Sequence, residues 1–278
     1  MKKKLIIILT VILFVILVFF FAFDSRLKVV EYIIESEKVS DEIKLALITD
    51  LHNCLYGENQ SQLLGEMEKA EPDAVLLGGD IFDNVYVNDN GKVLIKSLSK
   101  AYKTYYVSGN HEWWGNEMYE IFEFLENAGV TVLRGDTEIM ESDGKCAVKI
   151  SGIDDPDVNE YDSAYTSFDK QLENVANNAE EKHFDILLTH RPEFGERYFD
   201  SHFDLVLAGH AHGGQFRLPF IMNGFFAPNQ GFLPKFAGGC YDFKRGKMIV
   251  SRGLSRENFS LPRIFNRPEL VFVTVTNQ

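Results

Sequence analysis

The chain has 278 residues and carries 41 acidic against 28 basic side chains, a formal net charge of −13 at pH 7. This charge argues against nucleic acid as a stable partner and against adhesion to an anionic lipid surface. Cys54, Cys146 and Cys240 contain no CxxC pair, which excludes a disulfide framework and a thiolate metal site. The sequence carries no signal for an oligomeric state.

The first 23 residues differ from the rest of the chain. Lys2, Lys3 and Lys4 precede an uncharged run of 19 residues from Leu5 to Phe23. At about 1.5 Å per helical residue, this run nearly crosses a hydrocarbon core of roughly 30 Å. A cleaved signal peptide is the alternative, but its apolar region is usually shorter and the exit after Phe23 is a poor cleavage site. The run therefore predicts one transmembrane helix, a membrane anchor over residues 1–23.

The lysines before the anchor favour a cytoplasmic N-terminus. The rest of the chain is then expected outside the cytoplasm, on a single-pass protein of the cell membrane. Without these lysines it has 25 basic and 41 acidic residues, a formal charge of −16. We expect a mixed-charge stalk over residues 24–43 and one large domain over residues 44–278.

From residue 44 onward, short apolar runs alternate with segments of helical periodicity. Strands are expected at 45–49, 74–77, 104–107, 185–188 and 205–208, and helices at 60–70, 93–101 and 117–127. This alternation predicts an α/β fold. Later segments at 248–251 and 270–276 alternate as strands without long helices between them, which predicts an added, more antiparallel sheet. The expected architecture is two packed β-sheets flanked by helices.

Residues that commonly ligate metals gather where these strands end. Five of the seven histidines fall in the motifs Asp50-Leu51-His52, Gly79-Asp80-Ile81-Phe82-Asp83, Gly109-Asn110-His111-Glu112, His190 and Gly209-His210-Ala211-His212. In open α/β sheets, ligands bind beyond the carboxyl ends of the strands, so five strand ends should converge. Oxygen and imidazole donors together suit a hard or borderline divalent metal.

Most of these motifs are weak when taken singly. Side chains two residues apart in an extended segment point the same way, so Asp50 and His52 can share a metal, but Asp-x-His also occurs by chance. Asp80 behind two glycines is also an ordinary turn signal, and a lone histidine such as His190 is more often structural. The pair His210 and His212 is harder to explain as packing, because the glycines around it give clearance for a ligand.

The ordered set resembles the calcineurin-like metallophosphoesterase superfamily, whose pattern is D-x-H, G-D-x-x-D, G-N-H-[DE], H and G-H-x-H. It spans residues 50–212 here. The apolar N-terminus, the run 209–215 and the tail Ser251-Arg252-Gly253-Leu254 resemble its membrane-associated bacterial branch. That tail commonly reads R-G-L-G, and Ser255 stands here in place of the last glycine. The resemblance implies a four-layer sandwich of two sheets between helices.

The resemblance also implies a role for each motif position. One metal is held by Asp50, His52, Asp80 and His212, and the other by Asp80, Asn110, His190 and His210. Asp80 thus bridges two divalent ions, expected to be Mn, Fe or Zn. His111 stands near the leaving-group oxygen as the acid, and Asp83 and Glu112 lie behind the ligands. Arg191 is a candidate phosphate contact, although a surface arginine before a turn proline explains it equally well.

The expected reaction is dimetal-dependent hydrolysis of a phosphodiester or pyrophosphate bond, in a lipid-linked or cell-envelope substrate. Two divalent ions with only Asp50 and Asp80 as charged ligands leave the site positive, which attracts phosphate and activates water near neutral pH. The alternatives are a secreted nucleotidase or cyclic-nucleotide phosphodiesterase, and a scaffold that kept the fold but lost catalysis. Retention of every motif residue argues against the scaffold.

Residues 218–236, which follow the last motif, are unusually apolar for a loop. One interpretation is core packing beneath a long irregular segment. The other is an apolar rim for a lipid-linked substrate, or a surface that enters the membrane interface.

Overall fold

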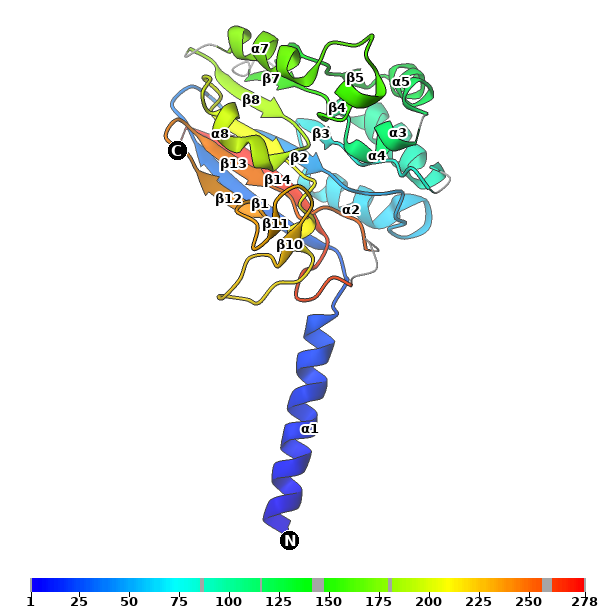
Figure 1. The fold of residues 1–278 in the computed structure, drawn as a ribbon, viewed down its shortest axis with the longest axis vertical. Helices are drawn as coiled ribbons and strands as arrows, with labels where there is room; N and C mark the ends of the chain where they lie inside the picture. The colour runs from blue at the N-terminus through cyan, green and yellow to red at the C-terminus, as the bar shows by residue number, and fades with distance from the viewer. Residues whose placement is uncertain are drawn as a thin grey trace.

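The computed structural model describes residues 2–85, 88–115, 117–141, 148–179, 182–256 and 262–277. Cys146 lies outside these ranges. An apolar helix, α1 (Lys2–Ala22), projects alone from a body that holds the sheets and the other helices (Figure 1). By length and composition α1 is able to cross a membrane, a test that a signal sequence also passes.

Two six-stranded sheets form the body. The strands β2 to β5 of the first sheet run parallel, whereas β14 is antiparallel to β2 and parallel to β1. In spatial order the first sheet consists of β1 (Lys28–Glu35), β14 (Glu269–Thr276), β2 (Ile43–Ile48), β3 (Ala74–Gly78), β4 (Lys103–Val107) and β5 (Thr131–Val132).

The second sheet has a parallel centre of β13, β9, β8 and β7 with an antiparallel strand at each edge. A separate hairpin pairs β10 (Phe226–Ala227) with β11 (Gly231–Phe232). In spatial order the second sheet consists of β12 (Gly239–Asp242), β13 (Lys247–Val250), β9 (Leu205–Ala208), β8 (Phe184–Leu188), β7 (Val148–Gly152) and β6 (Asp136–Met140).

The helices connect the strands and bury one apolar face each. In α7, for example, Phe168, Leu172 and Val175 are buried at helical spacing. The helices of the body are α2 (Ser61–Ala70), α3 (Asp89–Ala101), α4 (Asn110–Trp114), α5 (Met118–Asn127), α6 (Val158–Tyr161), α7 (Phe168–Asn178) and α8 (Gly195–Tyr198), with short 3₁₀ turns η1 (Glu58–Gln60), η2 (Pro192–Phe194) and η3 (His212–Gly214).

The core has two parts because the central strands are buried on both faces. Leu45 and Leu47 of β2 pack between the sheets, in one apolar cluster with Leu207 of β9. The alternate residues Ala46 and Ile48 pack in a second cluster with side chains from the helices. Strands buried on both faces read as continuous apolar runs, as they do here. This arrangement confirms the expected α/β fold of two packed sheets flanked by helices.

The expected stalk over residues 24–43 is corrected by the structure. Lys28–Glu35 form β1, which pairs along its whole length with β14, and Val39 is buried. The mixed charges of β1 reflect its position at the edge of the sheet, where one face is solvated. The chain therefore enters the folded domain soon after α1 ends.

The C-terminal strands do not form the expected added, more antiparallel sheet, because they join two different sheets. β13 joins the second sheet in parallel with β9, and β14 inserts between β1 and β2 of the first. Local alternation indicates a strand but not its partner, because the partner is decided by long-range packing. β6, β7 and α7 were not expected from the sequence, although the spacing of Phe168, Leu172 and Val175 carried the signal for α7.

Candidate metal centre

Five strands from the two sheets end at one place. A motif residue follows each of them: Asp50 after β2, Asp80 after β3, Asn110 after β4, His190 after β8 and His210 after β9. In each sheet these strands are direct neighbours and run parallel. The fold therefore brings the motifs together at the carboxyl ends of the strands, as expected.

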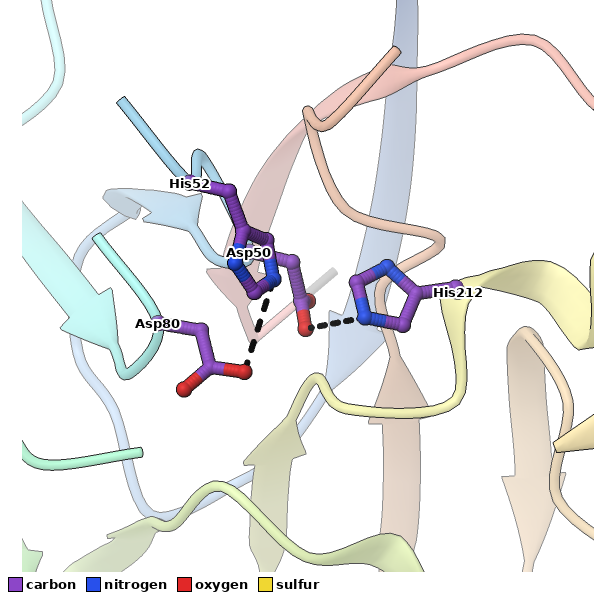
Figure 2. Close-up of side chains that lie close together, drawn as sticks. All are labelled: Asp50, His52, Asp80 and His212. Carbon is purple, nitrogen blue, oxygen red and sulfur yellow. Dashed lines mark ion pairs between the residues drawn. The ribbon is translucent and has the colours of Figure 1, made fainter. Parts of the chain in front are cut away.

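Asp50, His52, Asp80 and His212 form one buried group. One nitrogen or oxygen atom of each lies within 4.8 Å of those of the others (Figure 2). His52 Nε2 is 3.5 Å from Asp80 Oδ2, and His212 Nε2 is 3.5 Å from Asp50 Oδ1. Two carboxylates and two imidazoles facing one point make a donor set suited to a divalent metal.

Asp80, His190 and His210 form a second group of the same kind. His190 Nε2 is 3.2 Å from Asp80 Oδ2 and 3.2 Å from His210 Nδ1. Asn110 is buried next to this group, since the backbone N–H of the following residue donates to Asp80 Oδ1 at 2.9 Å. Asp80 thus belongs to both groups.

The side chains of this centre fit cations rather than one another. Burying a polar atom without a hydrogen bond costs about 1–3 kcal/mol. Within the described part of the chain, four buried atoms at the centre have no hydrogen-bond partner: Asp50 Oδ2, His52 Nε2, Asp80 Oδ2 and Asn110 Oδ1. Three of these four atoms are oxygens, which can only accept a hydrogen bond. A metal ion can take the place of the missing donor.

The imidazoles are oriented by oxygens behind them. His190 Nδ1 donates to Gly78 O at 2.8 Å, and His52 Nδ1 donates to Asp83 Oδ2 at 3.2 Å. His210 is turned the other way, with Nε2 donating to Asn229 Oδ1 at 2.9 Å. Each ring therefore turns its other nitrogen toward the centre, where it can ligate a metal once it carries no proton, which is the usual arrangement behind metal-bound histidines.

The charges of the protein groups are coupled across the centre. Burial favours the neutral ring of His190, but the negative charge of Asp80 outweighs burial and raises the pKa of His190 to about 10. Burial also favours the neutral carboxyl of Asp80, but the positive charge of His190 holds the pKa of Asp80 well below its usual range. Burial, followed by the charge of Arg191, holds the pKa of His210 well below its usual range, so this ring is neutral and able to ligate. The centre as a whole attracts positive charge.

Backbone strain is concentrated at the same residues. A left-handed conformation of a residue other than glycine costs on the order of 1–3 kcal/mol and clusters at functional sites. Five motif residues adopt it: Asp50 (φ 51°), His52 (φ 44°), Asp80 (φ 52°), His210 (φ 65°) and His212 (φ 46°). The turns after the strands are therefore bent in a way that aims these side chains inward.

Glu112 and Asp83 lie directly behind the candidate ligands. The carboxylate of Glu112 accepts backbone N–H groups of Gly109 at 2.9 Å, Asp80 at 3.0 Å, Ile81 at 2.8 Å and Phe82 at 3.1 Å. It thereby holds the turn after β3 against the start of α4. Asp83 orients His52 and lies 3.6 Å from His111 Nδ1.

His111 lies at the rim of the centre, with 14% of its side chain exposed. Its Nδ1 donates to Asn84 Oδ1 at 2.9 Å, and its ring packs edge-on against that of His52 with centroids 4.3 Å apart. Burial favours the neutral ring, but the contact with Asp83 and the charge of Asp80 outweigh burial and raise the pKa of His111. These contacts favour the protonated form of this ring at the rim of the centre.

The structure corrects one of the two interpretations of Arg191. It is only 3% exposed, so it is not a surface arginine. Its nitrogens contact Asp155, with Nη2–Oδ1 at 2.8 Å, and Asp157 at 3.0 Å, and Nη1 donates to Asn229 Oδ1 at 2.7 Å. Nε, Nη1 and Nη2 all have protein partners, which gives Arg191 a positioning role beside the centre. Arg191 holds Asn229, which in turn orients His210.

Three residues near the centre were not expected from the sequence. Asp155 follows the end of β7, so the strand-end pattern carried a signal that was lost because β7 was not predicted. Asn84 and Asn229 lie in irregular segments and carry no local signal. The substituted tail position, Ser255, is accommodated, since its backbone N–H donates to Asp50 O at 2.6 Å. Gly253 beside it has φ 71°, and an added Cβ would lie 2.5 Å from Asp50 Cβ.

Sequence and structure comparisons place this arrangement among known proteins. The family model described as calcineurin-like phosphoesterase matches residues 43–214. An uncharacterized metallophosphoesterase of Aquifex aeolicus is 30% identical over 256 residues, covering 90% of this chain and 92% of the relative. A bovine transmembrane protein with a metallophosphoesterase domain is 27% identical over 201 residues, covering 67% of this chain and 45% of its own length.

Among solved structures, a dimetal phosphatase from Danio rerio superposes with a TM-score of 0.50. It is 13% identical in sequence, and the match covers 76% of this chain and 88% of the other. At this identity the likeness concerns the fold alone.

The close packing of Gly109 against Asp80 yields a prediction about metal retention. A Cβ at position 109 would lie 2.2 Å from Asp80 Oδ1 and 2.5 Å from Asp80 N. Gly109→Ala should therefore displace the shared carboxylate and lower metal content, measured by mass spectrometry of the purified chain, without deleting any candidate ligand.

In the matched control, Gly65→Ala on α2, a Cβ meets nothing within 4 Å. That control should keep its metal and gain up to about 1 kcal/mol of helix stability. Full metal content in Gly109→Ala would contradict the packing account.

Proposed function

Because this chain belongs to the calcineurin-like phosphoesterase family and is a phosphate-ester hydrolase, we propose that it cleaves a phosphodiester or pyrophosphate bond in a lipid-linked or cell-envelope substrate. The observation that carries the proposal is the position of Asp80 in both groups of candidate ligands. A single carboxylate between two donor sets is the arrangement that a two-metal clamp on phosphate requires.

We assign one metal to Asp50, His52, Asp80 and His212, and the other to Asp80, Asn110, His190 and His210. Divalent ions held there supply Lewis acidity and an activated water to phosphate-ester hydrolysis. The mixture of imidazole and carboxylate favours Mn, Fe or Zn over Ca. Asp83, Asn229 and Gly78 O keep the ligating nitrogens turned inward.

His111 is the proposed general acid. Its Nδ1 is engaged by Asn84, so its Nε2 is the nitrogen left to meet the leaving-group oxygen. A leaving alkoxide or phosphate needs a proton as the bond to phosphorus breaks, and a positioned histidine is the usual source. Trp114, 38% exposed with its ring 4.8 Å from that of His111, lines the same side.

The membrane placement is part of the proposal. We infer that α1 crosses the membrane, with its N-terminal lysines in the cytoplasm and the catalytic domain outside. The hydropathy and length of α1 support this placement, and the name of the bovine relative fits it. An enzyme held at the membrane surface meets lipid-linked or envelope phosphates at high local concentration.

A nucleotide substrate is the second candidate. The exposed Trp114 ring beside His111 is the observation that favours it, since an indole face can stack on a base.

The bridging assignment predicts a specific loss of metal. Asp80→Ala removes an oxygen from both groups, so the full chain should lose both metals. The exposed surface carboxylate Asp169 supplies the control, and Asp169→Ala should retain both. Metal content is measured on each purified protein. Two tightly held metals in Asp80→Ala would refute the assignment of the ligands.

The acid assignment predicts a dependence on the leaving group. His111→Ala should keep both metals yet lose on the order of 10²–10⁴ in kcat for esters with poor leaving groups. Esters with acidic phenol leaving groups need no proton, so their loss should be much smaller. The measurement is kcat for a series of aryl phosphodiesters with both proteins. An equal loss across the series would argue against His111 as the acid.

The substrate proposal predicts a preference at the membrane. With the full chain in vesicles, a lipid pyrophosphate or phosphodiester in the same bilayer should be hydrolysed with a higher kcat/KM than a soluble nucleotide. Preference for the nucleotide would favour the second candidate, and Trp114→Ala should then raise KM for that substrate.

A further inference from the structure

We propose that the loop after the metal centre inserts into the lipid bilayer beside α1, as a second membrane contact of the domain. We call this segment, residues 218–233, the aromatic loop. The proposal rests on the proposed placement of α1 in a membrane, and it adds which face of the domain meets the lipid. Six of the large apolar side chains of the aromatic loop are exposed: Phe220 (109%), Ile221 (82%), Phe225 (41%), Phe226 (36%), Phe232 (70%) and Leu233 (68%).

Three of the exposed rings gather on the hairpin. The centroid of the Phe232 ring lies 5.2 Å from that of Phe225 and 5.4 Å from that of Phe226, across the β10–β11 hairpin. The hairpin is fixed to the domain, because Ala227 within it is fully buried. Core packing, one of the two interpretations of this segment, therefore applies to Ala227, whereas the six side chains named above are exposed. Exposed apolar side chains on a fixed hairpin indicate a partner with an apolar interior.

The aromatic loop lies at the end of the domain from which α1 emerges, as the position of β10 and β11 shows (Figure 1). Backbone hydrogen bonds connect the two. The N–H of Phe265 donates to Ala22 O, the last residue of α1, at 2.7 Å. Its neighbour Ile264 pairs with the start of the loop, since Arg217 N donates to Ile264 O at 3.0 Å. The position of the loop is therefore set relative to the anchor.

The connection between α1 and the sheet leaves the domain little freedom to turn away. Only residues 23–27 separate the end of α1 from the start of β1. Arg267 holds this connection, donating to Arg26 O at 2.9 Å and to Leu27 O at 2.7 Å. If Ala22 stands at the membrane boundary, the aromatic loop is kept at the same level.

The negative charge of the domain favours an apolar contact with lipid over an electrostatic one. Residues 24–278 carry a formal charge of −16, so electrostatic adhesion to an anionic lipid surface is disfavoured. Aromatic and branched side chains enter the interface through apolar burial instead, and phenylalanine is well suited to this depth. A lipid bilayer is therefore the partner that fits the surface.

The segment that is bonded to α1 is also bonded to the metal centre. Asn266, next to the residue bonded to α1, donates from Nδ2 to His212 O at 2.7 Å and to Gln215 O at 3.2 Å. The same short segment thus joins the anchor, the root of the aromatic loop and a candidate metal ligand. Insertion of the loop fixes the height of the centre above the lipid headgroups.

The test measures depth and does not depend on catalysis. The full chain carrying Phe220→Trp is reconstituted into phosphatidylcholine–phosphatidylglycerol vesicles, with and without brominated acyl chains that quench nearby indoles. The added emission should be lost in brominated vesicles. The control is Ile139→Trp, an exposed apolar site (55%) on β6, which borders β7 at the end of the domain away from α1 (Figure 1). Its added emission should remain, and the unmodified chain gives the background of Trp113 and Trp114.

Two results would overturn the proposal. One is equal quenching at positions 220 and 139. The other is a blue-shifted Phe220→Trp emission without bromine quenching, which would mean that a second copy of the chain covers the loop. Leu233→Trp, 68% exposed in the unmodified chain, repeats the measurement if the first variant folds poorly. Absence of phosphoesterase activity in the same vesicles would count against the proposed function alone, because quenching needs no turnover.

Discussion

Two hydrogen bonds that cross from one sheet to the other hold the centre together. His210 N donates to Asp50 Oδ1 at 2.9 Å, and His190 Nδ1 donates to Gly78 O at 2.8 Å. Each joins the carboxyl end of a strand in one sheet to a strand end in the other. The apolar cluster between the sheets sets their separation, and these bonds set their register at the edge where the ligands lie. The donor groups of both metals depend on that register, since Asp80 and Asp50 come from one sheet and His190 and His210 from the other.

The centre is costly to build from protein groups alone. It combines buried acceptor atoms without hydrogen-bond partners, coupled charges and left-handed backbone at Asp50, Asp80 and His210. The surrounding structure stabilises this arrangement through contacts made to its backbone. Glu112 is the largest of these supports, because one carboxylate accepts four backbone N–H groups from the turn after β3 and the start of α4. The folded chain therefore holds the candidate ligands in place before a metal binds.

The strand ends were the part of this site that local sequence predicted well. A short apolar run followed by Asp, Asn or His marks a buried strand and the turn after it, and both properties are local. The partners of β1, β13 and β14 were beyond such reasoning, because a strand pattern does not name the strand beside it. The interpretation of Arg191 as a surface arginine failed for a related reason. Its sequence neighbours suggested a surface turn, but its environment is made by Asp155 and Asn229, which come from distant segments.

The central claim of this account is that one carboxylate, Asp80, joins two metal ions in a single centre. Electron paramagnetic resonance of the full chain loaded with Mn²⁺ tests this claim directly, because ions that share a bridging ligand are magnetically coupled. The account predicts the spectrum of a coupled Mn²⁺ pair once both sites are filled. A spectrum of isolated Mn²⁺ ions, unchanged in form from the first equivalent added to the second, would contradict it.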